Sequence, residues 1–434
     1  MACFDKSIDI EVPGLYDIPL PRVARVRQKL SGQRVDDIAG EISRGVDALP
    51  GAAAKLKNKK IAVTGGSRGI ADYAAIMRSL VTKLKEMGAE PFIIPAMGSH
   101  GGGTAEGQKK ILAGFGIDES SMGAPIVSSM ETVVVGELPN GRKVHCDKHA
   151  WESDGIVLFN RVKPHTDFKG EWESGMLKMI AVGLGKHEGT TALHRAGFIN
   201  FHTQIPETGK FFLSLGKILF GVTTVENGYE QVMRIDVTAP EDIVEREREL
   251  LVIARENMAR LPFEQLDILF VDEIGKNISG SGMDPNVMGR PGGGMPFPGT
   301  PKIGCIAVTG LSKETHGSAV GLGAADIVTR DTVEQINLAP MYINHITSGA
   351  IRGAAIPLVA RDDEEAVRIA LYTVPAKEGK EATFVRIRNT LLLEEFEVSE
   401  NMLPDLRARP DVFTILEEPR PMRFVNGKLN KIRF

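Results

Sequence analysis

The segment from Asn160 to Gly197 holds the densest group of reactive side chains in this 434-residue chain. It reads NRVKPHTDFKGEWESGMLKMIAVGLGKHEGTTALHRAG and contains three histidines and four lysines between glycine-rich turns. A second segment, MGSHGGGT at Met97–Thr104, adds His100 where an expected strand gives way to an expected helix. Because imidazole changes its charge near neutral pH, the two segments together predict a proton-handling pocket.

Three histidines and one lysine stand out by their surroundings. His100 is followed by glycines, which expose the ring. His165 follows the expected strand GIVLFN, and α/β proteins collect ligands where strands end. Lys178 lies in the apolar sequence GMLKMIAVGLG, which favours a lowered pKa and a nucleophilic amine, although extension into solvent is the alternative. His194 lies in an expected helix, where a half-buried surface histidine is the alternative to a ligand.

The sequence TGGSRGIA at 64–71 resembles the nucleotide-binding loop of short-chain dehydrogenases, in which glycines let the backbone approach a pyrophosphate. Gly65, Gly66 and Ser67 are therefore candidate cofactor contacts. Arg68 in the same turn could hold a phosphate or a carboxylate through two hydrogen bonds. The Tyr-x-x-x-Lys pair of those dehydrogenases is missing from the chain. An NAD(P)-dependent oxidoreductase stays an alternative hypothesis, and a non-catalytic nucleotide- or anion-binding protein is another.

The composition is that of an ordinary globular protein, with 42% apolar and 25% charged residues. A formal net charge of −4 gives no reason to expect nucleic acid or an anionic membrane as a partner. The three cysteines are far apart and form no C-x-x-C pair, which predicts a reducing compartment. The N-terminus lacks the pattern of a signal peptide, and no apolar run has the roughly 18 residues of a membrane span. We therefore expect a cytoplasmic protein.

The length predicts two domains, because single cores stop growing at roughly 250–300 residues. From Lys59 onward, apolar strands alternate with amphipathic helices, which is typical of an α/β fold. A charged helix is expected at 241–260, and a new apolar run begins at Leu266. We therefore expect one α/β domain at residues 1–261, carrying the reactive segments, and a second α/β domain at residues 262–434.

The order of the reactive elements resembles the nickel-dependent lactate racemase family. A glycine-rich turn with an arginine is followed by Ser-His-Gly, then by Lys-Pro-His, then by a glycine-flanked lysine and, sixteen residues later, by a histidine. The likeness runs from about Lys59 to Phe198. In that family two α/β domains enclose an active-site cleft between them, and the cofactor is a nickel pincer nucleotide. The reaction inverts a 2-hydroxy acid through a transient 2-keto acid.

The resemblance implies a role for each reactive residue. Lys178 would hold the cofactor through a thioamide, and His194 would ligate nickel. His100 and His165 would be the acid/base pair, one on each face of the carbinol carbon. Arg68 would hold an anionic group. The implied partners are a small-molecule 2-hydroxy acid and the enzymes that synthesise the cofactor, which is needed because no amino-acid side chain accepts a hydride.

The resemblance leaves some assignments open. The stretch before Lys178 is longer than in the family, so Lys169 or Lys186 could compete for the cofactor. His187 is the alternative metal ligand. In the second domain Arg290, in a glycine-bounded loop, is a candidate for binding an anionic group of the substrate. Lactate itself is not implied as the substrate.

Overall fold

The structure is a computed structural model, which describes residues 11–195, 197, 200–291, 297, 299–375 and 379–430. The chain forms two compact units. The N-terminal unit is Ser31–Met258, and the C-terminal unit combines Met1–Leu30 with Ala259–Phe434. Each unit has a mainly parallel sheet with helices, so the expected α/β class is confirmed.

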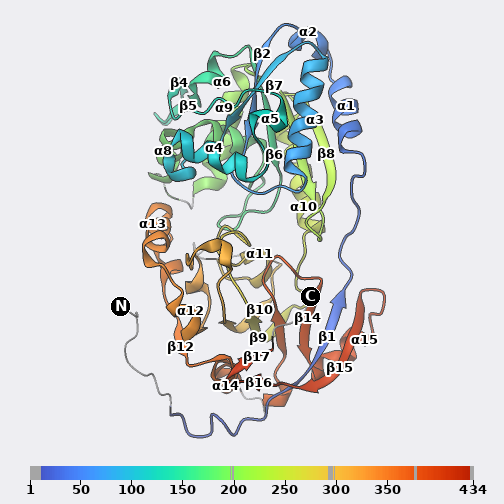
Figure 1. Cartoon of the computed structure of the whole chain (residues 1–434), viewed down its shortest axis with the longest axis vertical. Coiled ribbons are helices and arrows are strands. Elements are labelled where there is room, and N and C mark those ends of the chain that lie inside the picture. The colour runs from blue at the N-terminus through green and yellow to red at the C-terminus, as the bar shows by residue number, and fades with distance from the viewer. Residues whose placement is uncertain are drawn as a thin grey trace. The chain divides into compact units, whose positions relative to one another are not determined.

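A five-stranded sheet forms the centre of the N-terminal unit (Figure 1). The strand order is β3-β2-β6-β7-β8; the first four strands run parallel, and β8 runs antiparallel to β7. The strands are β2 (Lys60–Gly65), β3 (Glu90–Pro95), β6 (Gly155–Arg161), β7 (Ile218–Glu226) and β8 (Val232–Thr238). The chain order reverses between β2 and β6, and open α/β sheets bind ligands at such a point, beyond the carboxyl ends of the strands. The loops after β2, β3 and β6 share that edge.

Helices α1 and α3 cover one face of this sheet. The expected helical spacing of Ile76, Leu80 and Leu84 is confirmed, since all three side chains are fully buried on α3. The helices of the unit are α1 (Ile38–Asp47), α2 (Ala52–Leu56), α3 (Tyr73–Glu86), α4 (Ala105–Gly114), α5 (Glu119–Met122), α6 (Lys148–Glu152), α7 (Met176–Lys178), α8 (Lys186–Arg195), α9 (Phe201–Ser214) and α10 (Ile243–Asn257).

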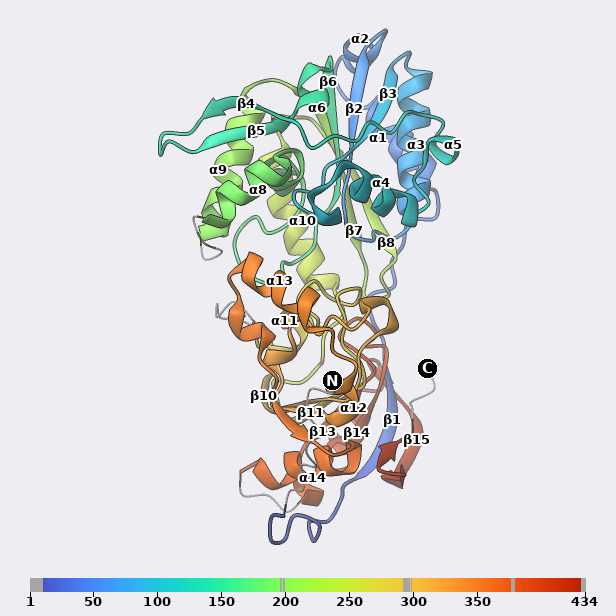
Figure 2. The same cartoon turned by 60° about the vertical axis from the view of Figure 1, so that its left-hand side comes forward.

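A separate antiparallel hairpin joins β4 (Thr132–Glu137) to β5 (Lys143–Asp147). It lies beside α8, as Figure 2 shows. The last residue of the hairpin, Asp147, caps α6 by accepting a hydrogen bond from the N–H of Ala150 at 3.0 Å. The hairpin therefore adds a buried carboxylate next to the reactive segment.

The C-terminal unit contains an eight-stranded sheet of order β12-β11-β10-β9-β13-β14-β1-β15. Its strands are β1 (Arg22–Gln28), β9 (Gln265–Val271), β10 (Lys302–Val308), β11 (Ile327–Thr329), β12 (Leu358–Ala360), β13 (Phe384–Ile387), β14 (Glu395–Ser399) and β15 (Phe413–Pro421), with a small ribbon of β16 (Phe424–Val425) and β17 (Lys428–Leu429). The accompanying helices are α11 (Pro285–Met288), α12 (Arg330–Glu334), α13 (Leu338–Ser348), α14 (Asp363–Thr373) and α15 (Leu403–Arg407). Apolar cores lie on both faces of the sheet.

The division of the chain differs from the expected one at residues 1–261 and 262–434. Strand β1 pairs antiparallel with both β14 and β15, so residues 22–28 belong with the C-terminal unit. The reason is that strand pairing joins segments far apart in sequence, which local patterns do not reveal. The assignment of residues 22–28 to the N-terminal domain was therefore wrong.

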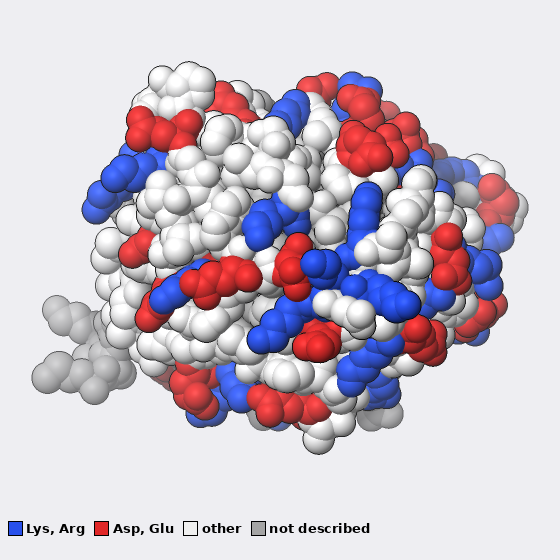
Figure 3. Space-filling model, turned by 90° about the horizontal axis from the view of Figure 1, so that it is seen from above, with Lys and Arg blue, Asp and Glu red and all other residues white. Residues whose placement is uncertain are grey.

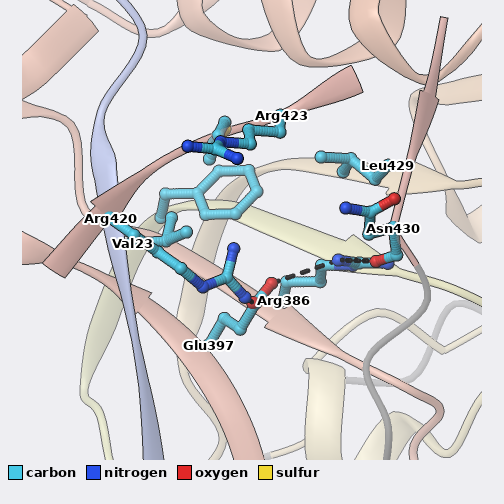
Figure 4. A pocket seen from close by; sticks show the side chains of 9 residues that line it. Val23, Arg386, Glu397, Arg420, Arg423, Leu429 and Asn430 are labelled. Atoms are coloured by element: carbon cyan, nitrogen blue, oxygen red, sulfur yellow. Dashed lines mark hydrogen bonds and ion pairs between the residues drawn. The ribbon is translucent and has the colours of Figure 1, made fainter. Parts of the chain in front are cut away.

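A buried ion-pair network crosses the sheet of the C-terminal unit (Figure 4). Arg386 on β13 lies 2.7 Å from Asp272 and 3.1 Å from Glu397, and Glu397 also pairs with Arg420. Burial raises the pKa of Asp272 to about 6, although Arg386 opposes the shift. A small pocket beside this network is lined by none of the residues that we expect to do chemistry. The network is therefore structural.

Basic and acidic side chains are interspersed on the face shown in Figure 3. In the described part of the chain, no helix is both long and apolar enough to cross a membrane. The expectations about nucleic acid, membranes and the cytoplasm stay predictions.

The loop after β3, which carries His100, is built on glycines in left-handed conformations. Gly101 and Gly102 both have φ of +68°. A Cβ atom at Gly101 would lie 2.6 Å from the backbone carbon of Gly107, whereas a Cβ atom at Gly102 would meet nothing within 4 Å. The backbone conformation disfavours a side chain at both positions, but only at Gly101 do neighbouring atoms also leave no room for one.

This difference predicts unequal costs for the same substitution. Gly102→Ala should lower the free energy of unfolding by about 1–2 kcal/mol through backbone strain alone, and Gly101→Ala should lower it by clearly more. Urea unfolding followed by tryptophan fluorescence would measure this, because both tryptophans of the chain, Trp151 and Trp172, lie in the N-terminal unit. Equal losses for the two variants would contradict the packing at Gly101.

Candidate active site

The loops after β2 and β3 meet at the switch point. Ser67 Oγ, after β2, is hydrogen-bonded to His100 Nδ1, after β3. Arg68 follows Ser67, and its side chain is exposed. Among the described residues, the Arg68 guanidinium has no hydrogen-bond or ion-pair partner. The structure therefore joins two expected site residues and leaves a third free to bind an anion.

His165 lies in the loop after β6 with its side chain 13% exposed. The ring stacks on Phe168, with centroids 4.3 Å apart and planes at 29°. The Nδ1 atom accepts a hydrogen bond from the backbone N–H of Asp167 at 3.0 Å and lies 3.8 Å from a carboxylate oxygen of the same residue. Because Nδ1 is an acceptor here, the neutral ring carries its proton on Nε2.

Electrostatics hold His165 in this neutral form. Burial lowers its pKa well below the usual value, and the nearby charges of Lys178, Lys169 and Arg68 lower it further. These charges act on the imidazole only because they are close to it. Charges from two different loops, Arg68 after β2 and Lys178 after β6, therefore act on His165.

A fully buried carboxylate, Glu173, organises the His165 loop. It accepts hydrogen bonds from the backbone N–H of His165 at 2.7 Å and of Gly170 at 3.1 Å. Arg255 on α10 donates to it at 2.7 Å, and Lys169 lies 3.5 Å away. Two cations and two amides therefore compensate its burial.

Lys178 ends the short helix α7, which close packing fixes in place. Met176 at the start of α7 lies directly on Gly221 of β7, where a Cβ atom would approach its sulfur to 1.9 Å. Glu247 of α10 caps the same helix by accepting from the N–H groups of Met176 and, at 3.1 Å, Leu177. Burial raises the pKa of Glu247 to about 8, although these hydrogen bonds oppose the shift.

The Lys178 amine is the chemically distinctive one among the lysines of this segment. Lys163 pairs with Glu230 at 3.5 Å, and Lys169 pairs with Glu173. In contrast, Lys178 has no hydrogen-bond or ion-pair partner among the described residues. Burial, followed by the charge of Arg68, lowers its pKa to about 8.

Lys186 is likewise held by a carboxylate, at 3.0 Å from Asp147. Lys178 is therefore the lysine of this segment without a carboxylate partner among the described residues, and a pKa of about 8 leaves an appreciable fraction of neutral amine near pH 7.

His194 lies on α8, close enough to Lys178 to feel its charge. Burial lowers the pKa of His194, and Lys178 lowers it further. The ring packs edge-on against Phe201, with centroids 5.3 Å apart. A neutral imidazole is the form that ligates a metal, so the surroundings suit the expected role. His187, the alternative ligand, is exposed at the start of the same helix.

The described residues contain no group of three or more His, Cys, Asp and Glu side chains that could hold a metal ion. A metal at His194 would therefore need further donors from a cofactor. Imidazole combined with sulfur donors is a suitable ligand set for nickel.

The loop at 64–71 does not have the geometry of a dinucleotide site. Helix α3 begins only at Tyr73, and the N–H of Ala71 donates to the buried carboxylate of Glu226 at 2.8 Å. Glu226 is in turn paired with Arg161. A negative side chain thus occupies an N–H group at the helix start, where a dehydrogenase would bind the pyrophosphate. This contact argues against the NAD(P)-dependent alternative.

The glycines of this loop close β2. Gly65 is the last residue of the strand, and its carbonyl accepts from the N–H of Ala96 at 2.8 Å. The carbonyl of Gly66 accepts from the hydroxyl of Tyr73 at 3.1 Å. The expected contacts of Gly65, Gly66 and Ser67 with a cofactor stay predictions.

Arg290 does not have the expected surroundings. Its guanidinium pairs with Asp326 at 2.5 Å and donates to the carbonyls of Ile303 at 2.8 Å and Gly304 at 3.0 Å. Both carbonyls lie at the amino end of β10, opposite to the edge where such sheets bind ligands. These contacts engage both terminal nitrogens of Arg290 and do not support a role in substrate binding, so that expectation stays a prediction.

The comparisons with known proteins agree with this arrangement. Residues 38–205 match the lactate racemase N-terminal domain. The matched segment includes Arg68, His100, His165, Lys178 and His194.

The fold is also similar to solved structures. The lactate racemase apoprotein from Thermoanaerobacterium thermosaccharolyticum matches with a TM-score of 0.54 and 16% identity, over 89% of this chain and 97% of that chain. A protein from Thermotoga maritima matches with a TM-score of 0.48 and 15% identity, over 75% of this chain and 84% of that chain. No curated protein matches the sequence. At these identities the likeness concerns the fold.

Sequence reasoning did not predict the structural roles of two carboxylates of the site, Glu173 and Glu247. A local signal existed for Glu173, since it stands four residues after Lys169, a spacing that favours ion pairs. Glu247 gave no such signal, because it reaches α7 from a helix much later in the chain. Its charge made the helix look like an ordinary solvated one.

The electrostatic coupling in the site predicts a change in the titration of His165. Lys178→Met should raise the pKa of His165 toward its usual value, because it removes the largest charge effect while burial remains. Imidazole NMR over a pH series on cofactor-free protein would measure it. Lys163→Met is the control, since that amine pairs with Glu230. An unchanged His165 pKa in the Lys178 variant would show that the two groups are not neighbours.

The buried Glu247 predicts a pH-dependent stability. Its pKa is about 8 in the folded protein against a reference value of 4.5, so between these pH values folding takes up a proton and stability falls as the pH rises. Glu247→Gln should remove this dependence. In that window the free energy of unfolding of the variant should rise relative to that of the parent by on the order of 1 kcal/mol per pH unit. Urea unfolding at several pH values would test it. Glu256→Gln, at an exposed position of the same helix, should follow the parent.

Proposed function

We propose that this protein is a racemase or epimerase that inverts the carbinol carbon of a 2-hydroxy acid with a nickel pincer nucleotide linked to Lys178. The observation that carries the proposal is the uncommitted Lys178 amine. Its pKa is about 8, lowered by burial and by the charge of Arg68, and its own charge lowers the pKa values of His165 and His194. The family of residues 38–205 supports it.

The residues present fit the proposed cofactor. Lys178 would hold it, and His194 would ligate its nickel. When bound, the cofactor would supply the hydride acceptor that no side chain provides. The protein's own requirement is a neutral amine for attachment and a neutral imidazole for the metal, and the lowered pKa values of both groups favour these forms.

The remaining residues would bind the substrate and move protons. The uncommitted guanidinium of Arg68 would hold the carboxylate with two hydrogen bonds. Ser67 can accept from or donate to His100 Nδ1, so His100 Nε2 can begin as base or acid. His165 begins differently, since its Nε2 carries the proton while Nδ1 accepts from Asp167.

For His165 to accept a proton at Nε2, its own proton must lie on Nδ1. The carboxylate of Asp167, 3.8 Å from Nδ1, can receive that N–H after a small rotation. Asp167 would then orient His165 as a base. Inversion from either side requires one neutral histidine as base and one imidazolium as acid, because a neutral imidazole that gave up its Nε2 proton would become an imidazolate.

The cofactor assignment is tested by mass spectrometry of protein co-expressed with the enzymes that make the cofactor. We expect the adduct on the peptide that contains Lys178, and none in Lys178→Ala. Lys163→Ala should keep the adduct. Attachment at Lys163, Lys169 or Lys186 would show that the wrong lysine was chosen. Co-expressed protein that carries neither an adduct nor nickel would favour a non-catalytic anion-binding protein.

The same preparation tests the reaction on a panel of 2-hydroxy acids. His100→Ala and His165→Ala should each lower racemisation by about 10²- to 10⁴-fold in both directions, with the adduct retained. His149→Ala, on α6, is the control and should not change the rate. Parental rates in either active-site variant would exclude the two-base mechanism.

A further inference from the structure

Of the four lysines in the Asn160–Gly197 segment, Lys186 alone is fully buried. Its ammonium lies 3.0 Å from the equally buried carboxylate of Asp147. It also donates to the carbonyl of Pro95 at 2.5 Å and to Gln108 Oε1 at 3.3 Å. These three groups match the three donors of an ammonium. Attachment of a cofactor here would leave Asp147 charged and unpaired in the interior, so Lys186 has a different role.

Gln108 on α4 links Lys186 to the loop of His100. Its side chain is fully buried, and its amide donates to the carbonyls of Gly98 at 2.9 Å and His100 at 3.2 Å. Pro95 is the last residue of β3, just before the loop. Lys186 therefore holds the start of the loop directly and its middle through Gln108.

The His100 loop needs such a tether because its backbone is intrinsically free. Gly98 and Gly101–Gly103 all adopt positive φ, and glycine loses more conformational freedom on ordering than any other residue. The exposed ring of His100 adds its hydrogen bond to Ser67. Carbonyl contacts from a buried side chain restrict the backbone that carries this ring.

Lys186, which makes these contacts to the His100 loop, belongs to the same segment as Lys178. A π-helix at Met179–Leu184 directly follows Lys178, and Lys186 comes two residues later with φ of +52°. Non-glycine residues adopt this conformation only where the surroundings impose it, and π-helices are frequent at functional sites. The unusual backbone directs the Lys186 amine beneath the His100 loop.

We infer that Lys186, with Asp147 and Gln108, is a positioning residue that fixes the His100 loop relative to the segment carrying Lys178. The inference rests on the proposed function, in which His100 transfers a proton beside a cofactor on Lys178. It gives Lys186 the task of holding the acid/base loop at a constant distance from the cofactor.

The test uses Gln108→Met, which removes the contacts to the loop and keeps the Lys186–Asp147 pair. In cofactor-free protein, amide hydrogen exchange of the peptide 97–104 should become about 10-fold faster, as expected for the loss of one to two hydrogen bonds. The imidazole ¹⁵N shifts of His100 should lose the signature of its bond to Ser67. In loaded protein, kcat should fall about 10- to 100-fold with little change in KM, and the Lys178 adduct should remain.

Two further variants make the outcome decisive. Gln204→Met, at a buried position of α9 whose side-chain oxygen has no partner, should leave exchange, shifts and kcat unchanged. The double variant Lys186→Met with Asp147→Asn removes both charges and keeps a side-chain oxygen that can cap α6, and it should loosen the loop as Gln108→Met does.

Unchanged exchange and shifts in both loop variants would overturn the inference. Faster exchange with a parental kcat would overturn it as well, because the tether would then be structural only. If the parent protein racemises no 2-hydroxy acid, the proposed function fails, while the His100 shifts in cofactor-free protein still decide whether Lys186 and Gln108 position that ring.

Discussion

The parallel pairing of β2 with β6 is the constraint on which the site depends. Ile61, Ala62 and Val63 align with Gly155, Ile156 and Val157, although more than ninety residues of chain separate the strands. This pairing places the reversal of strand order between them, so the loops after β2, β3 and β6 open at one edge. Any other register would separate Arg68 and His100 from the segment of His165 and Lys178.

Buried carboxylates hold the loops and helices of the site in place through hydrogen bonds and ion pairs. Glu173 gathers the amides of the His165 loop, Glu247 caps the helix of Lys178, and Asp147 holds Lys186 beneath the His100 loop. Each comes from a different element and satisfies backbone amides or an ammonium that would otherwise be costly to bury. The cations that these carboxylates neutralise are structural.

Ion pairing distinguishes the cationic side chains that stabilise the structure from those that remain available to bind a ligand. Lys163, Lys169 and Lys186 all pair with carboxylates, whereas Lys178 and Arg68 have no such partner among the described residues. The two uncommitted charges lower the pKa of His165 and act on each other. An anionic substrate or cofactor would relieve this repulsion, so the positive charge of the site favours the binding of an anion.

The sequence by itself determined the α/β class, the strand-to-helix pattern around Ile76, Leu80 and Leu84, and the segments that carry the reactive histidines and Lys178, because apolar periodicity and glycine-bounded loops are local signals. The tertiary structure alone decided which lysine is unpaired, that Arg290 is structural, that Glu247 caps α7 and that residues 22–28 join the other sheet. Those facts depend on contacts between segments distant in the chain, and the burial that sets pKa values and ion pairing exists only once such segments have packed together.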